Sequence, residues 1–191
     1  MERRSLILGQ GQRPKMLTKE QLKAAIPCED YTDSFIDQIF GTIESGTLDD
    51  ILAAPVDICD KIWILLREPW LNPTQLRTLA KQFYTDIEHL DATPETKSYR
   101  QMTLAASKGD LTDERFWDRD PEYMNKWREA TSLESQMATL SGVWAALTVN
   151  SQAKALNLNE EDRKETLYLH RQWQMTAILE TIDPNRYSEA F

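Results

Sequence analysis

A chain of 191 residues in which 41% of the residues are apolar and 28% are charged is long enough to bury a large core, which excludes an intrinsically disordered class. Its six glycines are few for an all-β protein with many tight turns, so the composition favours helix. The formal net charge of -9 disfavours contact with phosphate backbones, and direct nucleic-acid binding is excluded from the expected functions.

The cysteines and the apolar runs define the expected compartment. Cys28 and Cys59 are the only cysteines, and neither has a second thiol nearby in the sequence, so we predict no disulfide framework and no cysteine-based metal site. The apolar run Leu6–Leu8 is far too short for a secretion signal. The sequence also has no run of about 18 uncharged apolar residues that could span a membrane. We therefore expect a soluble, cytoplasmic protein that does not bind membranes.

The start of the chain differs in pattern from the remainder. Residues 1–17 contain Gly9, Gly11 and Pro14 among polar residues and show no sustained apolar period, which predicts a flexible N-terminal arm. Apolar residues at helical spacing begin after this segment. The sequence therefore predicts a single all-α domain over residues 18–191.

Two helices are expected directly after the arm. Thr18 and Gln21 form a capping-box pattern, which begins a short helix that ends before Pro27. Apolar residues at helical spacing over residues 31–43 then predict a longer helix, for which Gly46 is the expected end.

Four start signals follow in the middle of the chain. Thr47 is the expected cap of one helical turn, and Asp57 begins a densely apolar helical segment. The pairs Asn72-Pro73 and Thr93-Pro94 each combine an N-cap residue with a proline at the first helical position. Each pair therefore predicts the beginning of an amphipathic helix.

The longest predicted helix lies in the second half of the chain. Apolar residues alternate at spacings of three and four from about Glu122 to Asn150, which predicts one continuous helix. Gly142 inside it either weakens this prediction or marks a close helix crossing. Asn159 caps a last helix that ends at Pro184. Altogether we expect about seven helices in a multi-helix bundle or compact helical array, with no sheet.

Negative charge is concentrated in one segment. Residues 24–60 contain no Lys or Arg and carry a formal charge of -9, equal to that of the whole chain. Such a segment either is a solvated face or docks a basic protein surface, whose approach its field would accelerate. The residues predicted to contact such a partner are Asp33, Asp37, Glu44, Asp49 and Asp50.

Trp70 is a further candidate for partner binding. It lies in a short connection next to Pro69, where a large aromatic side chain either folds back over the core or is displayed for a partner. We include it among the predicted partner-binding residues.

The sequence contains no recognised catalytic motif. There is no Gly-x-Ser-x-Gly elbow, His-Glu-x-x-His helix or P-loop, so we predict no catalytic residues, no cofactor and no enzymatic activity. Asp86 and His89 are three residues apart on one helical face, a spacing that suits a metal. His170 and Glu165 do not repeat this spacing. We therefore expect no metal site, and assign these histidines to surface or interhelical hydrogen bonds.

Three segments resemble a group of bacterial all-helical proteins that includes immunity proteins of toxin–immunity loci. They are Asp60–Arg67, Leu76–Ala80 and Gln172–Asn185, and the similarity extends over roughly residues 57–191. The resemblance implies an all-helical binding protein and assigns no chemical role to individual residues.

The leading expectation is therefore a non-enzymatic protein-binding domain, such as an immunity protein or antitoxin that neutralises a basic enzyme through the acidic segment. One alternative is a helical enzyme, metal-dependent through Asp86 and His89. A second alternative is a phage-type or structural interaction protein. The oligomeric state is left open.

Overall fold

A computed structural model describes residues 15–24, 33–67, 69–116 and 121–187 of the chain. Within these residues the chain forms ten α-helices, one short 3-10 helix and one two-stranded sheet. In chain order the elements are β1 (Leu17–Thr18), α1 (Lys19–Ala24), α2 (Asp33–Phe40), β2 (Ser45–Gly46), α3 (Leu48–Ala53), α4 (Ile58–Leu65), α5 (Pro73–Ile87), α6 (Pro94–Lys108), η1 (Glu114–Phe116), α7 (Pro121–Ala130), α8 (Leu133–Ala155), α9 (Glu160–Ile182) and α10 (Pro184–Tyr187).

The helical class is confirmed, but the expectation of about seven helices and no sheet is wrong. Strands β1 and β2 pair antiparallel, with Leu17 opposite Gly46 and Thr18 opposite Ser45. Each strand has only two residues, which is too short for the apolar–polar alternation that identifies a strand in a sequence.

Most helices begin where the sequence predicts. At four of these starts the side chain of the N-cap residue accepts a hydrogen bond from a backbone N–H three residues later, and this satisfies a donor that the helix itself cannot pair. The caps of this kind at predicted starts are Thr47 on α3, Asn72 on α5, Thr93 on α6 and Asn159 on α9. Thr18 and Gln21 also form the predicted capping box at α1, with bonds of 2.9 and 3.1 Å.

Helix α2 ends earlier than predicted. Its end is at Phe40, and Gly41 follows with φ of +56°, a left-handed conformation in which glycine has no steric penalty. The Gly41 N–H donates to the carbonyl of Asp37 over 2.7 Å. Gly46, the predicted end, lies in β2 instead.

The long helix expected from Glu122 to Asn150 is divided into α7 and α8. Ser132 between them has an extended backbone and caps α8, because its side chain accepts from the N–H of Ser135. The side chain of Gln136 donates to the carbonyls of Arg128 and Thr131, each over 3.0 Å. These bonds satisfy carbonyls at the end of α7 and stabilise the break.

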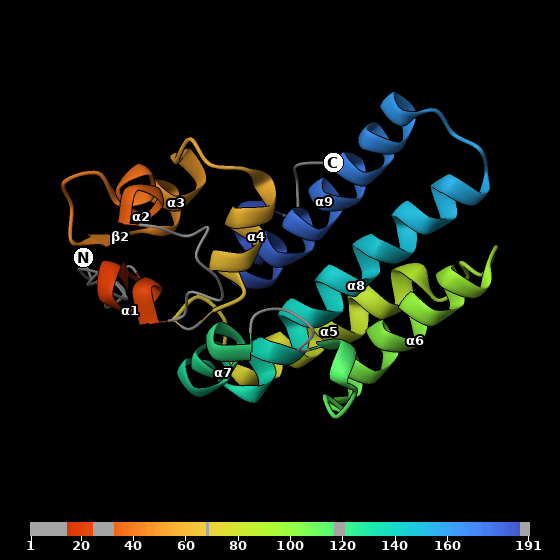
Figure 1. The fold of residues 1–191 in the computed structure, drawn as a ribbon. Coiled ribbons are helices and arrows are strands. Elements are labelled where there is room, and N and C mark those ends of the chain that lie inside the picture. Colours follow the sequence, from red (N-terminus) through yellow and green to blue (C-terminus); the bar gives the residue numbers. More distant parts are fainter. Residues whose placement is uncertain (1–14, 25–32, 68, 117–120, 188–191) are drawn as a thin grey trace, which may run out of the picture.

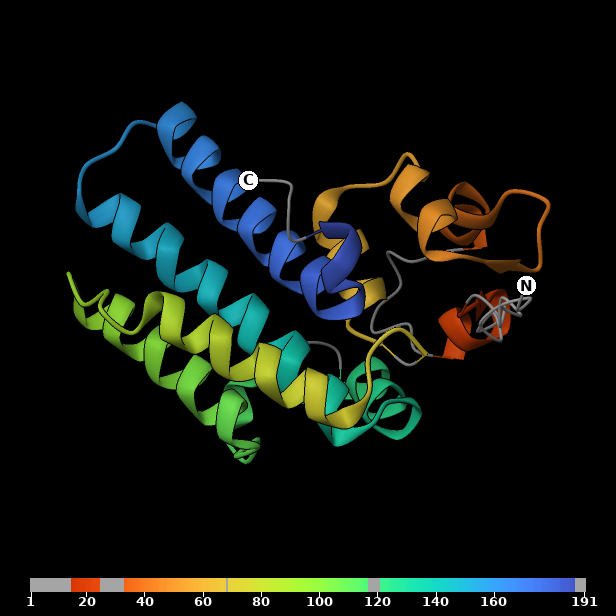
Figure 2. The same ribbon diagram turned by 180° about the vertical axis from the view of Figure 1, so that it is seen from behind.

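The helices form two groups that Figures 1 and 2 show from opposite sides. Helices α5, α6, α8 and α9 are the long elements, with α5 and α6 packed against α8. Helices α1, α2 and α3 lie together with the small sheet at the other end of the molecule, and α4 joins them to α9. Among the described helices, none is long and apolar enough to cross a membrane.

Gly142 marks a close helix crossing on α8, the second of the two expectations for this residue. A Cβ atom at Gly142 would lie 3.4 Å from the Phe83 ring on α5 and 3.7 Å from the Gln174 side chain on α9. The buried Gln174 amide donates to the Gly142 carbonyl over 2.9 Å. The small residue therefore lets α5 and α9 approach α8 together.

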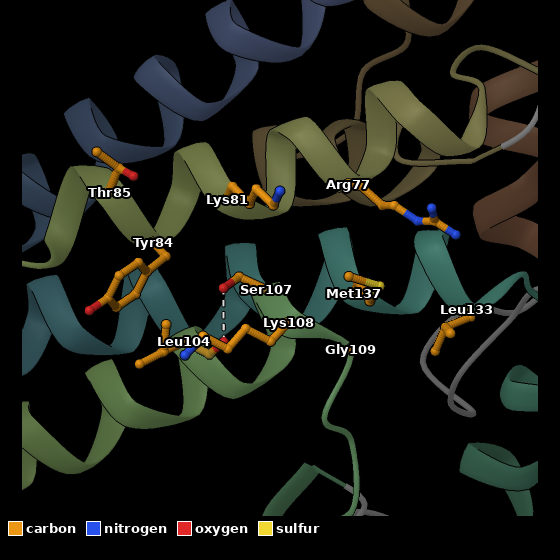
Figure 3. Close-up of a pocket in the computed structure, with 10 residues that line it drawn as sticks. All are labelled: Arg77, Lys81, Tyr84, Thr85, Leu104, Ser107, Lys108, Gly109, Leu133 and Met137. Carbon is orange, nitrogen blue, oxygen red and sulfur yellow. Dashed lines mark hydrogen bonds between the residues drawn. The ribbon is translucent and has the colours of Figure 1, made fainter.

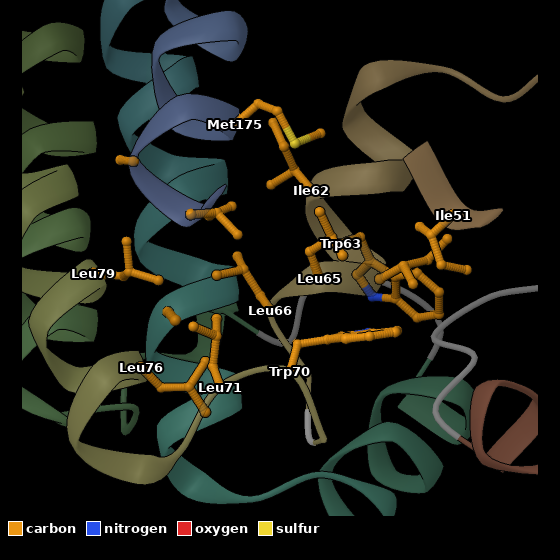
Figure 4. Packing of buried hydrophobic residues seen from close by; sticks show 14 of the residues in the cluster. Ile51, Ile62, Trp63, Leu65, Leu66, Trp70, Leu71, Leu76, Leu79 and Met175 are labelled. Carbon is orange, nitrogen blue, oxygen red and sulfur yellow. The ribbon is translucent and has the colours of Figure 1, made fainter. Parts of the chain in front are cut away.

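A large apolar core extends from α1 to α9. It joins the buried side chains of α4 to those of α5, α8 and α9, with Trp63, Trp70 and Met175 among its larger members. Figure 4 shows Ile62 beside Met175 of α9 and Leu71 beside Leu76 of α5, whereas the rings of Trp63 and Trp70 extend toward Ile51 of α3. A smaller cluster around Phe116 and Trp127 packs under α6 and α8.

Residues 15–17, the last three of the predicted arm over residues 1–17, lie in the described part of the chain. Leu17 belongs to β1 and is only 1% exposed, and the side chain of Lys15 donates to the carbonyl of Trp70 over 2.9 Å. The single β1 leucine gives no periodic signal, so the sequence pattern did not indicate that Leu17 is buried. Residues 1–14 lie outside the described part of the chain.

We expect Leu17→Ala to lower the free energy of unfolding by about 2–4 kcal/mol, because a buried leucine loses its apolar contacts and leaves a cavity. Met16→Ala is the matched control: Met16 is 44% exposed, and an exposed position should change stability by less than about 0.5 kcal/mol. Urea unfolding followed by circular dichroism measures both. Equal stability of the two variants would show that β1 does not pack.

Candidate partner-binding face

Four of the predicted acidic residues lie on the group of short helices that contains α2 and α3. Asp37 is on α2, Glu44 precedes β2, and Asp49 and Asp50 are in the first turn of α3. Figure 1 places α2, β2 and α3 side by side, away from α6 and α8. We call Asp37, Glu44, Asp49 and Asp50 the acidic face. Asp33 begins α2, but its side chain lies outside the described part of the structure.

Lys19 connects two members of the acidic face. Its backbone N–H donates to the Glu44 carbonyl over 3.0 Å. Its ammonium group donates to Asp37 Oδ1 over 3.3 Å and to the Gly41 carbonyl over 2.9 Å. The Asp37 side chain remains 67% exposed, whereas that of Lys19 is only 16% exposed, so the carboxylate stays open to solvent while the lysine stem is largely covered.

Asp49 and Asp50 also have partners within the chain. Asp50 Oδ2 accepts from the Thr47 N–H over 2.8 Å and from the Thr47 hydroxyl over 2.7 Å. These bonds, the backbone one above all, lower the pKa of the Asp50 carboxyl. Asp49 Oδ1 lies 2.8 Å from the Arg186 guanidinium, and this hydrogen bond raises the pKa of Arg186.

The negative charge of the acidic face is therefore partly compensated. Lys19 and Arg186 supply positive charge from outside residues 24–60, so the absence of Lys and Arg within this segment overstates the local field. The Glu44 side chain is exposed and forms no ion pair with any residue the structure describes. The face thus has two ion pairs, Lys19–Asp37 and Arg186–Asp49, and two carboxylates, Glu44 and Asp50, without a cationic partner among the described residues.

Trp70 is buried rather than displayed on the surface. The prediction that it contacts a partner is therefore wrong. The residue is 1% exposed, and Figure 4 shows its ring inside the core beside Trp63. The backbone N–H of Trp70 donates to the Arg67 carbonyl over 3.0 Å. The turn after α4 thus folds the ring back, because burial of an indole on this scale is strongly favourable.

Asp86 contacts His170 rather than His89. His170 Nδ1 on α9 lies 3.3 Å from Asp86 Oδ2 on α5, and the imidazole stacks on Trp173 with ring centroids 5.8 Å apart. His89 is exposed. Among the described residues no group of three His, Cys, Asp or Glu side chains could hold a metal ion.

The buried Arg67 was not anticipated by the sequence analysis. It is 4% exposed and lies between two indoles, with its guanidinium carbon 4.6 Å from the Trp63 ring centroid and 5.5 Å from that of Trp127. One guanidinium nitrogen donates to Ser135 Oγ over 3.0 Å. Its position at the end of the apolar run of α4 is the only sequence signal that would have identified it.

Comparison of the chain with protein-family models, curated proteins and solved structures found no match. The resemblance to immunity proteins is therefore a prediction that rests on the three sequence segments named above.

Proposed function

We propose that the protein is a non-enzymatic binding domain that engages a basic protein through the acidic face. The observation that carries this proposal is the gathering of Asp37, Glu44, Asp49 and Asp50 from separate segments onto one exposed group of elements. Within this proposal the finer role is that of an immunity protein or antitoxin that neutralises a basic enzyme such as a nuclease.

The weak internal ion pairs of the acidic face suit such a role. Both side chains of the Arg186–Asp49 pair are at least half exposed, and an exposed pair contributes about 1 kcal/mol or less, so a Lys or Arg of a partner replaces Arg186 at small cost. Asp37 is itself 67% exposed and open to a partner. An exposed concentration of like charge also attracts an oppositely charged protein before contact and raises the association rate. The expected partner surface is therefore rich in Lys and Arg.

The test begins with partner capture by the immobilised protein and identification by mass spectrometry, followed by association kinetics for each captured protein. For the variant Asp37→Asn, Glu44→Gln, Asp49→Asn we expect an association rate at least about tenfold lower at low salt. Because Debye screening weakens the attraction of exposed charges, the difference should shrink as the ionic strength rises.

The matched control neutralises three exposed carboxylates outside the acidic face, with the substitutions Glu88→Gln, Asp91→Asn and Glu180→Gln. It changes the net charge equally, and we expect its association rate to fall by less than about twofold. Equal effects of the two variants, or a rate independent of salt, would contradict docking through the acidic face. Protection of cells that co-express the captured enzyme then separates an immunity protein from a structural interaction protein.

A further inference from the structure

A cavity of about 580 Å³ opens between α5, α6 and the first turns of α8. Figure 3 shows α5 on one side and α6 on the other, with α8 behind them. The volume falls within the range of small-molecule sites. We call this cavity the basic groove, after its cationic residues Arg77, Lys81 and Lys108.

The charge of the basic groove is opposite to that of the chain. Arg77, Lys81 and Lys108 line it, and none of the described lining residues is acidic, whereas the net charge is -9. Arg77 forms an ion pair with Glu134. Lys81 and Lys108 are exposed and form no ion pair with a residue that the structure describes. Two ammonium groups therefore remain to bind an anion.

The remainder of the lining is largely apolar. Leu104 on α6 and Leu133 and Met137 on α8 contribute to it. Leu133 is 50% exposed although it is a large hydrophobic residue. Apolar surface beside a few polar groups is the usual construction of a ligand pocket, since the apolar part supplies affinity and the polar groups fix orientation.

We propose that the basic groove binds a small amphipathic anion, with its acidic group at Lys81 and Lys108 and its apolar part on Leu104, Leu133 and Met137. Lysine suits this role because its ammonium group is a point charge on a flexible stem that adapts to a carboxylate. The groove does not include any residue of the acidic face, so this site is independent of the proposed protein partner.

The experiment uses the full chain and decanoate as the probe, with decanol and decyltrimethylammonium as probes of equal chain length and different charge. Calorimetry gives affinity and stoichiometry, and methyl NMR spectra locate the bound probe. We expect one decanoate per chain, shifts of the Leu104, Leu133 and Met137 methyl signals, and at least about tenfold weaker binding of the other two probes, because charged hydrogen bonds are the stronger kind.

Two variants test the residues. Lys81→Gln with Lys108→Gln should weaken decanoate binding at least about tenfold. The control Lys97→Gln with Lys154→Gln removes two exposed lysines that do not line the groove and should leave affinity within about twofold. Leu133→Glu places a carboxylate at the first position of α8, where acidic residues favour a helix, and should abolish binding while the fold is retained.

Three outcomes would overturn the proposal. They are the absence of saturable decanoate binding below about 1 mM, equal binding of decanoate and decyltrimethylammonium, and equal affinity of the wild-type chain and the Lys81→Gln, Lys108→Gln variant. If an acidic amphipathic peptide shifts the groove methyl signals and decanoate does not, the occupant is a protein segment, and the small-anion proposal is wrong.

Discussion

Trp70→Ala is expected to lower the free energy of unfolding by about 3–5 kcal/mol, the largest effect of any single substitution proposed for this chain. Trp70 is 1% exposed within the main core, so its removal loses a large apolar surface and leaves a cavity that the surrounding helices fill only in part. Urea unfolding monitored by circular dichroism measures the change.

Two control substitutions test whether the loss of stability comes from the buried ring. Trp70→Phe should cost less than Trp70→Ala, because the ring is partly retained and Nε1 forms no hydrogen bond with a described residue. Tyr168 is 53% exposed, and Tyr168→Ala should change stability by about 0.5 kcal/mol or less. If Trp70→Ala changed the free energy of unfolding as little as Tyr168→Ala, the Trp70 ring would lie on the surface. This is the arrangement that display for a partner would require.

Arg67→Ala should lower the free energy of unfolding by about 3 kcal/mol. The guanidinium contacts the rings of Trp63 and Trp127, and a desolvated cation–π contact contributes about 2 kcal/mol. Substitution also removes the hydrogen bond to Ser135, which joins the end of α4 to α8. Chemical unfolding gives the magnitude, and near-ultraviolet circular dichroism reports the altered packing of the indoles.

Arg67→Lys separates the shape of the side chain from its charge. Lysine keeps the positive charge but lacks the planar group that stacks on both rings, so it should recover only part of the loss. Arg77→Ala is the exposed control. Arg77 pairs with Glu134, but its side chain is 57% exposed. The free energy of unfolding should therefore fall by about 1 kcal/mol or less. Full recovery by Arg67→Lys would contradict stabilisation by stacking.

Most helix starts and the most regular helices could be predicted from the residue pattern alone. Asn72 and Thr93 each accept a hydrogen bond from a backbone N–H three residues later, so the information for the cap lies within one helical turn. The amphipathic pattern of α5 is equally local, because its period depends only on helix geometry.

Two helix ends could not be predicted from the sequence, because more than one residue nearby could end the helix. Gly41 and Gly46 are both suitable helix ends, and the positive φ of Gly41 shows which of them ends α2. Ser132 interrupts an apolar repeat that continues on both sides of it. In both places the residue pattern allows more than one local conformation, and the structure shows which one forms.

The contacts between distant residues could not be predicted from the residue pattern. Arg186 approaches Asp49, and His170 approaches Asp86, although nothing near any of these residues in the sequence specifies its partner. The basic groove likewise requires α5, α6 and α8 to lie together. Such contacts depend on how the helices pack around a shared core, and packing is a property of the whole chain rather than of a local segment.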